Sequence, residues 1–483
     1  MIDRLTSAPF SFWVHSLVIG VLVIEALRRW KHPWAKPALA VYGTVIFWYT
    51  LDYLLSDPLG YQAFLPEVIS LAFHQVTLFL LSFRLMMAAF ARKFCDRPLR
   101  QQRHHSSDGR FIKAAFSPRL LRNLLIFLII AWSVIYAIGI ALTPERWAAM
   151  LWPPLYFEKI SMYPLAGVGG GISFIFNTIG YVHVLICALF GVVAAMARGP
   201  VRWIAIGMII LTWPYFWFDR ARNKMLALLF PGLAAFLLLG KGKLGTRVAV
   251  GVCIALFVGG WFSRVAEYRA QQDLTAFLNS SRSEAPKEGE QTKRNAARDG
   301  QDMLKELCWI NTFIASGKYV PSMGARYFAE VVNPIPRAIW PGKPMPGIDY
   351  AIARGFGGSR DGAGVFATIA TGMIGQGCVN FGRFYGVIAA AFLFALWAGF
   401  LARLWCQADS PIRLALFLIG LGLTFNTGRD LTLLVLFPFL FGYLGILVYE
   451  KLLGGRNPGL PIRSLGSPPS SRNSVDDNPP LIP

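Results

Sequence analysis

The sequence predicts an all-α protein, a polytopic bundle of about eleven transmembrane helices with a large, partly helical extracytoplasmic loop. Three observations carry this prediction. The chain is 55% hydrophobic but only 15% charged. Its apolar residues fall in blocks of roughly 16 to 26, the length that crosses a hydrocarbon core as a helix. Its cations cluster in alternate connections between these blocks.

The composition excludes an ordinary soluble protein. Soluble domains carry about 25% charged residues, whereas this chain carries 15%, so most of it has few side chains that water would solvate. Trp and Tyr gather near the ends of the apolar blocks, as they do in interfacial belts. The net charge of +21 over 483 residues has two sources. One is the Lys and Arg residues of the cytoplasmic connections, and the other is the long loop. The six cysteines have no metal-site spacing.

The apolar blocks give the predicted spans in chain order. They cover residues 10–27, 38–55, 65–90, 120–142, 171–196, 203–218, 225–240, 248–263, 384–404, 414–426 and 431–449. The first block is followed by Arg28, Arg29 and Lys31 and by no small-residue cleavage site, so we expect it to be a permanent span.

Four regions follow from these spans. Residues 1–263 hold the first eight spans, residues 264–383 form the large loop, and residues 384–449 hold the last three spans. Residues 450–483 are rich in Pro, Ser, Asn and Asp and are expected to form a disordered cytoplasmic tail.

Positive charge in the short connections sets the orientation. Lys and Arg are enriched in cytoplasmic connections, and here they follow the first, third, fifth, seventh and ninth predicted spans. Alternating spans place all of these clusters on one side. The N-terminus is therefore predicted outside, the C-terminus inside, and the long loop outside.

Two short outward connections break this charge rule. Arg220, Arg222 and Lys224 lie between the sixth and seventh spans, and Arg429 lies between the last two. Cations are disfavoured in short loops on that side. These residues therefore call for a functional explanation, such as binding an anion.

The loop contains three distinct segments. Residues 302–315 carry apolar side chains at near-helical spacing, which predicts a helix packed on the roof of the membrane domain. Residues 333–344 are rich in proline, which favours a rigid extended path that holds Arg337 and Lys343 in place. Residues 354–362 are basic and rich in glycine, so their backbone N–H groups can approach an anion closely, with Arg354 and Arg360 beside them.

The second half of the chain resembles a known family at two segments. Residues 335–344 read IPRAIWPGKP and resemble the "iPR-x-x-WP-x-KP" string of bacterial oligosaccharide repeat-unit polymerases, the Wzy-type O-antigen polymerases. Residues 371–382 read TGMIGQGCVNFG and are similar to the family's "G-E-x-x-x-NFG" stretch. Where the family pattern has a glutamate, this chain has Gln376, so no carboxylate role carries over there.

The resemblance implies a glycosyltransferase without a cofactor at the outer face of the bacterial inner membrane. It would transfer a growing glycan from undecaprenyl diphosphate to a hydroxyl of a new lipid-linked oligosaccharide, for O-antigen in lipopolysaccharide, for capsule or for exopolysaccharide. Its partners would be membrane lipids, a flippase and a chain-length regulator, and no nucleic acid is expected.

Arginine suits such a reaction because its planar fork matches phosphate oxygens and keeps its charge. Arg337 and Arg220 are the predicted catalytic arginines. The residues predicted to bind the diphosphate are Arg222, Lys343, Arg354, Arg360 and Arg429.

The acceptor hydroxyl also needs a base. None of the six histidines lies in the loop, and an interior hydrogen bond is the expected role of those within spans. Asp361, between two glycine-rich turns, is the predicted base, with Asp349, Asp430, Glu158 and Glu330 as further options. No Asp-x-Asp or HExxH pattern argues for a metal.

Three alternatives stay open. An O-antigen ligase uses the same donor but typically has a loop histidine, which this chain lacks. A polysaccharide transporter or flippase would need charges deep within its spans, whereas Glu25 and Arg84 lie near inner span ends, where snorkelling to the membrane surface explains them. The third is a non-catalytic subunit of an assembly complex.

Overall fold

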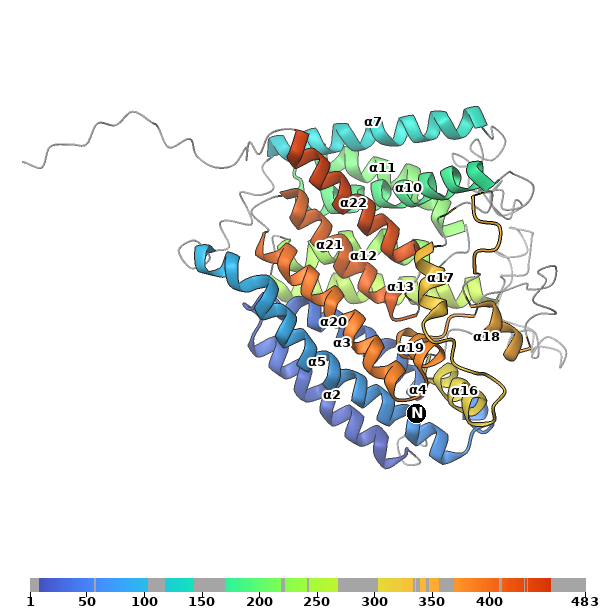
Figure 1. Cartoon of the computed structure of the whole chain (residues 1–483). Coiled ribbons are helices and arrows are strands. Elements are labelled where there is room, and N and C mark those ends of the chain that lie inside the picture. Colours follow the sequence, from blue (N-terminus) through green and yellow to red (C-terminus); the bar gives the residue numbers. More distant parts are fainter. Residues whose placement is uncertain are drawn as a thin grey trace, which may run out of the picture.

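The computed structural model describes fourteen stretches of the chain and is mainly helical in them, with no strand in these stretches. They are residues 8–55, 58–102, 118–142, 170–218, 222–240, 243–267, 303–332, 335, 339–344, 347–355, 369–407, 411–429, 431 and 433–452. The helices lie side by side in a bundle, and a group of short helices gathers at one end of it (Figure 1). The all-α prediction is confirmed for these residues.

The first part of the bundle contains the N-terminal helices of the described chain. Their elements are α2 (Phe10–Arg28), α3 (Ala35–Val45), η1 (Ile46–Thr50), α4 (Leu51–Leu55), η2 (Pro58–Tyr61) and α5 (Pro66–Gln102). The predicted span at residues 38–55 is a run of α3, the π-helical turn η1 and α4. A π turn inserts a wider ring into an α-helix and shifts the register of the side chains that follow.

The second part contains α7 (Pro118–Leu142), α10 (Gly170–Met196), α11 (Pro200–Phe218), α12 (Arg222–Leu239) and α13 (Leu244–Glu267). Gly191 and Gly232 let α10 and α12 approach closely, because a Cβ on Gly232 would lie 3.0 Å from the Gly191 carbonyl carbon. Small residues at such crossings allow helices to pack backbone against backbone.

The last part holds the short helices and three long ones. The short helices are α16 (Met303–Ala315), α17 (Ala325–Val332), α18 (Ile348–Ala353) and α19 (Met373–Phe381). The long ones are α20 (Tyr385–Cys406), α21 (Pro411–Thr427) and α22 (Leu433–Leu452). The described part of the proline-rich segment, between α17 and α18, is not helical, as its composition predicts.

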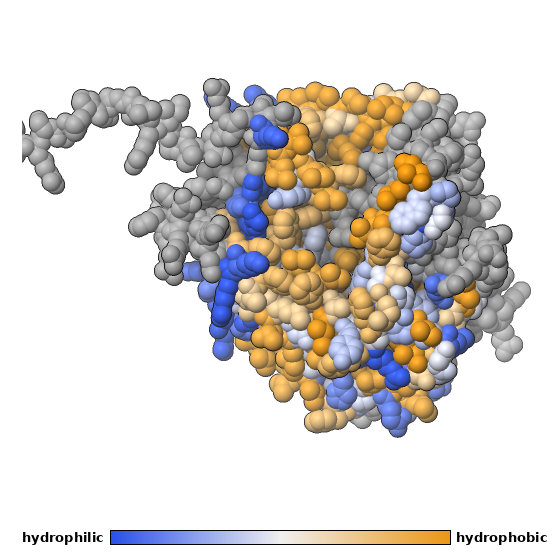
Figure 2. Space-filling view, viewed as in Figure 1, coloured by the Kyte–Doolittle hydropathy of each residue, from blue (hydrophilic) through white to orange (hydrophobic). Residues whose placement is uncertain are grey.

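Four helices within the described ranges are long and apolar enough to cross a membrane: Phe10–Arg28, Pro66–Phe94, Pro118–Ala141 and Tyr385–Cys406. Shorter apolar helices lie in five further predicted spans, at Val182–Met196, Lys224–Leu239, Gly245–Trp261, Arg413–Thr427 and Phe439–Val448. Figure 2 shows a mostly hydrophobic surface across the middle of the bundle, with hydrophilic atoms along the edge where α5, α20 and α22 end. The chain is therefore built like a membrane protein.

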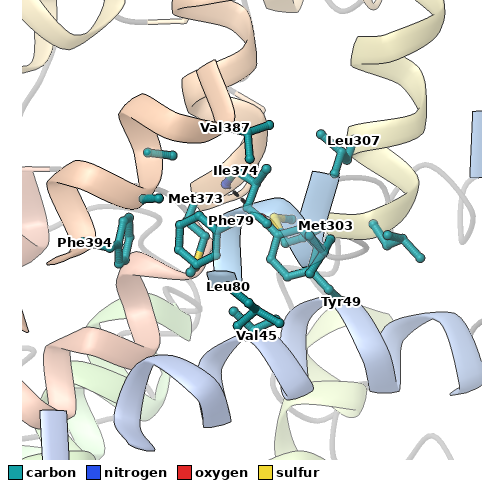
Figure 3. Packing of buried hydrophobic residues seen from close by; sticks show 14 of the residues in the cluster. Val45, Tyr49, Phe79, Leu80, Met303, Leu307, Met373, Ile374, Val387 and Phe394 are labelled. Atoms are coloured by element: carbon teal, nitrogen blue, oxygen red, sulfur yellow. Dashed lines mark hydrogen bonds between the residues drawn. The ribbon is translucent and has the colours of Figure 1, made fainter. Parts of the chain in front are cut away.

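One hydrophobic core joins α16 to the long helices. Met303 and Leu307 of α16 are fully buried beside Tyr49, Phe79 and Met373 (Figure 3). The α16 helix also receives a cap, since the Asp52 carboxylate accepts the Leu304 N–H at 3.2 Å near its N-terminus. A negative charge there is favourable for the helix dipole. The prediction that residues 302–315 form a helix packed on the membrane domain is confirmed.

Glu25 and Arg84, which the sequence analysis explained by snorkelling, are bound to each other. The Arg84 guanidinium donates from Nε and Nη2 to the two carboxylate oxygens of Glu25, at 2.9 and 2.6 Å. It also lies over the Trp34 ring, 4.8 Å from the centroid. A bidentate pair between α2 and α5 satisfies both charges within the bundle, and sequence spacing gave no sign of it.

Candidate functional site

The two segments that carry the family resemblance contact different neighbours at the same end of the bundle. The N-terminus of α19 is joined to the turn after α21 through the backbone. Gly372 N–H donates to the Arg429 carbonyl at 2.8 Å, and Met373 N–H donates to the Gly428 carbonyl at 3.0 Å. These two hydrogen bonds join residues more than fifty positions apart, and they fix the backbone of Arg429 against α19.

The Gln376 side chain completes this junction. Its Nε2 donates to the Leu431 carbonyl at 3.3 Å, and its Oε1 accepts the Leu431 N–H at 3.0 Å. Gln376 is fully buried. A carboxylate at this position could accept the Leu431 N–H, but at neutral pH it would have no proton to donate to the Leu431 carbonyl. The amide of Gln376, which stands where the polymerase pattern has a glutamate, satisfies both backbone groups.

Asn380, in the NFG part of the same segment, holds the loop between α16 and α17. It is fully buried. Its Nδ2 donates to the Gln376 carbonyl at 2.7 Å, while its Oδ1 accepts the Ser322 hydroxyl and the Tyr327 N–H, each at 3.3 Å. The amide therefore links α19 to the start of α17.

A reciprocal amide pair ties α16 to α5. Gln75 Nε2 donates to Asn311 Oδ1 at 3.0 Å, and Asn311 Nδ2 donates back to Gln75 Oε1 at 2.7 Å. Gln75 Nε2 also reaches the Arg383 carbonyl at 2.9 Å, just before α20. Buried polar groups are costly unless paired, so this fully used amide pair fixes how the loop helices sit on the bundle.

A buried ionic cluster joins α16 to α18. Arg354 donates from Nε and Nη2 to Glu306 at 3.0 and 3.3 Å, and its guanidinium lies 4.8 Å from the Trp309 ring centroid. The Tyr350 hydroxyl donates to the same carboxylate. Burial first, and then the charge of Glu306, raise the pKa of Tyr350 well above its usual value. Tyr350 is therefore a protonated donor at neutral pH.

Lys343 joins two parts of the proline-rich segment through a hydrogen bond. Its Nζ donates to the Ile335 carbonyl at 2.6 Å, and the nearby Trp340 ring lies 6.2 Å from that of Phe328 on α17. The described part of the segment is thus packed against α17, and Lys343 has a fixed place, as the sequence predicts.

The structure leaves several candidate residues untested. Arg220, Arg337, Arg360 and Asp361 lie outside the described residues, and Arg222 begins α12 with an undescribed side chain. Their roles stay predictions. Arg354 is described, and its ion pair with Glu306 would compete with a diphosphate for the same guanidinium.

Sequence reasoning missed the residues that organise this end of the bundle. Glu306 and Gln75 are buried, yet neither belongs to a sequence motif that would mark it. Of the histidines, His15 makes the expected interior bond, from Nε2 to the Thr50 hydroxyl at 2.8 Å, whereas His74 is exposed on α5.

No family model, curated protein or solved structure matches the chain.

Proposed function

We propose that this chain is a glycosyltransferase that polymerises undecaprenyl-diphosphate-linked oligosaccharide repeat units at the periplasmic face of the bacterial inner membrane. About eleven spans would cross that membrane, with the N-terminus outside. The short helices α16 to α19 would form a periplasmic cap over the spans, and the reaction would take place between this cap and the membrane surface.

One observation carries the proposal. The turn with Arg429 and the segment of residues 371–382 were each singled out by the sequence, and they are hydrogen-bonded to each other through Gly372 and Met373. The Gln376 amide strengthens the same junction at Leu431. An outward arginine in a short turn is disfavoured by topology, and here its backbone is held rigidly against the loop.

The proposed reaction is a substitution at a sugar. The bond between the anomeric carbon of the growing glycan and the diphosphate oxygen breaks, and a hydroxyl oxygen of the new lipid-linked unit bonds to that carbon. The hydroxyl proton goes to a base, with Asp361 as the candidate. The departing lipid diphosphate gains negative charge, and fixed arginines lower the barrier by stabilising that charge.

The cations divide into two groups on this proposal. Arg337 and Arg220 remain the candidates for contact with the diphosphate, with Arg222, Arg360 and Arg429 around them. Arg354 supports the cap instead, because its guanidinium is bound to Glu306 and covered by Trp309. Lys343 likewise braces the proline-rich segment through the Ile335 carbonyl.

Glycan length on a gel tests the proposal. A deletion strain is complemented with wild type, Arg337→Ala, Arg429→Ala or the control Lys318→Ala, which removes an exposed loop cation that lies over the Phe313 ring. We expect the deletion to leave a single repeat unit, Lys318→Ala to restore the ladder, and Arg337→Ala to fail at normal expression. Long unattached polymer on the carrier lipid in the deletion strain would indicate a ligase, and an unchanged ladder would contradict polymerase activity.

A further inference from the structure

The α17 helix has its polarity reversed relative to a helix on a water-soluble surface. Its charged residues Arg326 and Glu330 are only 6% and 8% exposed. Its apolar residues Phe328 and Val331 are 52% and 68% exposed. A helix that packs its charges inward and turns its apolar side chains outward is expected where the outer surroundings are not water.

The outward side chains of α17 belong to a larger apolar patch. We define this patch as Val320, Met323, Phe328, Val331, Ile339 and Trp340, which are between 36% and 80% exposed. They come from α17 and from the chain on both sides of it. Large exposed apolar side chains gathered along one short part of the chain favour a contact with another apolar phase or a partner. Trp340 adds an aromatic side chain of the type enriched at membrane interfaces.

An apolar groove of about 630 Å³ runs from α17 along α20. Its wall on α20 is formed at helical spacing by Tyr385, Ile388, Ala389, Phe392 and Leu393. Across from them it is lined by Tyr327, Glu330, Val331, Phe381, Leu431 and by Met86 of α5. Glu330 is the one charged residue of this lining.

The length of the groove matches one leaflet of a bilayer. The α20 helix has 22 residues, so it measures about 33 Å and is long enough to cross a hydrocarbon core of about 30 Å. The groove residues from Tyr385 to Leu393 cover about 12 Å of it, most of the depth of one leaflet. Tyr385 and Phe392 are 73% and 46% exposed, so the groove opens on the face of α20 that a membrane would cover.

We propose that this groove seats one acyl chain of a phospholipid from the leaflet on the α17 side, while the apolar patch lies at the boundary between headgroups and acyl chains. The groove runs along a spanning helix, as acyl chains run along the membrane normal, and it is continuous with that helix's lipid-exposed face. Glu330 and Tyr327 lie on the α17 wall of the groove. The inference depends only on the chain being a membrane protein, and not on the polymerase activity.

The first test measures the environment of the apolar patch by spin labelling. Met323→Cys and Phe328→Cys are labelled with a nitroxide in the full-length protein, in a background with Cys95 and Cys253 replaced by alanine, and reconstituted in phosphatidylglycerol nanodiscs. We expect both labels to collide with oxygen several times more readily than with a water-soluble nickel chelate. The control Lys318→Cys, on an exposed cation of the same loop, should show the opposite preference.

Two outcomes would overturn the interfacial placement. Nickel accessibility at Met323→Cys and Phe328→Cys equal to that at Lys318→Cys would place the patch in water. Labels shielded from both reagents, with a doubled particle mass, would make the patch a contact between two copies of the chain.

The second test fills the groove. Ala389→Phe places a ring in it, and Leu396→Phe adds the same ring on α20 at an exposed position outside it. Native mass spectrometry of detergent-purified protein titrated with dioleoyl phosphatidylglycerol counts the retained lipids. We expect Ala389→Phe to retain one lipid fewer than wild type and Leu396→Phe to retain the same number. Equal retention by both variants, at unchanged melting temperature, would contradict the groove as a lipid seat. If Ala389→Phe misfolds, Ala389→Leu makes the same test with a smaller side chain in the groove, and the same outcomes decide.

Discussion

The Gln376 side chain binds both backbone groups of Leu431, donating to its carbonyl at 3.3 Å and accepting its N–H at 3.0 Å. The side chain thereby acts as a short piece of backbone that pairs with the turn between α21 and α22. A pair of this kind needs a donor and an acceptor side by side on one planar group. The uncharged primary amides of Asn and Gln supply both.

We predict that Gln376→Glu weakens this junction. The carboxylate keeps the acceptor and loses the donor, which leaves the Leu431 carbonyl without this partner in a buried place, at a cost of about 1–3 kcal/mol. The melting temperature of the purified protein should fall. The matched control is Gln62→Glu, at an exposed position, where the same change should leave the melting temperature almost unaltered. A Gln376→Glu variant as stable as wild type would show that the junction contributes nothing to stability.

The Glu306–Arg354 pair gives a second prediction. Glu306→Gln leaves the Arg354 guanidinium buried without its counter-charge, which typically costs about 3–5 kcal/mol. Adding Arg354→Met should recover much of the loss, because the double variant removes the unpaired charge. Denaturation of the two single variants and the double variant gives the coupling between the residues.

The exposed cation Lys318 serves as the control for that experiment. Its Nζ lies 4.6 Å from the Phe313 ring centroid, a contact worth about 0.5–1 kcal/mol at an exposed site. Lys318→Met should therefore cost far less than Glu306→Gln. Equal effects of the two substitutions would argue against a buried ion pair between Glu306 and Arg354.

A third prediction concerns the crossing of α19 and α20. A Cβ on Gly377 would overlap the carbonyl oxygen of Gly386, and the reverse also holds. Gly377→Ala must push the two backbones apart and should cost about 1–3 kcal/mol. Gly20→Ala is the control, since no atom lies within 4 Å of its added methyl group; it should be neutral or slightly stabilising, as Ala is the better helix former.

The fourth prediction is a pH dependence at the alkaline side. The pKa of Tyr350 is raised in the folded protein, first by burial and then by Glu306. The folded state therefore holds this proton more tightly than the unfolded state, whose tyrosine titrates near ~10. The stabilisation is complete below that pH and is lost as the pH rises toward the folded value. Tyr350→Phe should flatten the alkaline fall in melting temperature; an unchanged fall would exclude Tyr350 as its source.

The sequence predicted the parts of this fold that depend on local pattern. Hydrophobic block length placed the predicted spans on stretches of helix, one of them the run of α3, η1 and α4, and the spacing of Met303, Leu307 and Phe313 predicted α16 and the face it buries. The missed features join distant residues. Gln75 and Asn311 are 236 positions apart, and Glu306 and Arg354 are 48 apart, so no local period reveals them.

The α17 helix shows a different limit of sequence reasoning. Its apolar and charged residues alternate at helical spacing, but the pattern alone does not say which side faces inward. The usual assumption would bury Phe328 and expose Arg326, and the structure has the reverse. Because the surroundings decide the direction, an amphipathic segment next to a membrane needs tertiary contacts before its faces are assigned.

The pair between Glu25 and Arg84 has a consequence for how the chain is made. The two residues are 59 positions apart, and ribosomes add about 5–20 residues per second. Glu25 is therefore synthesised roughly 3 to 12 s before its partner. During that interval Arg29, one turn away on the same helix and 3.2 Å from Glu25 in the finished protein, is the counter-charge at hand. We expect the nascent first helix to rely on this local pair alone, and to gain the bidentate pair with Arg84 beside it when α5 inserts.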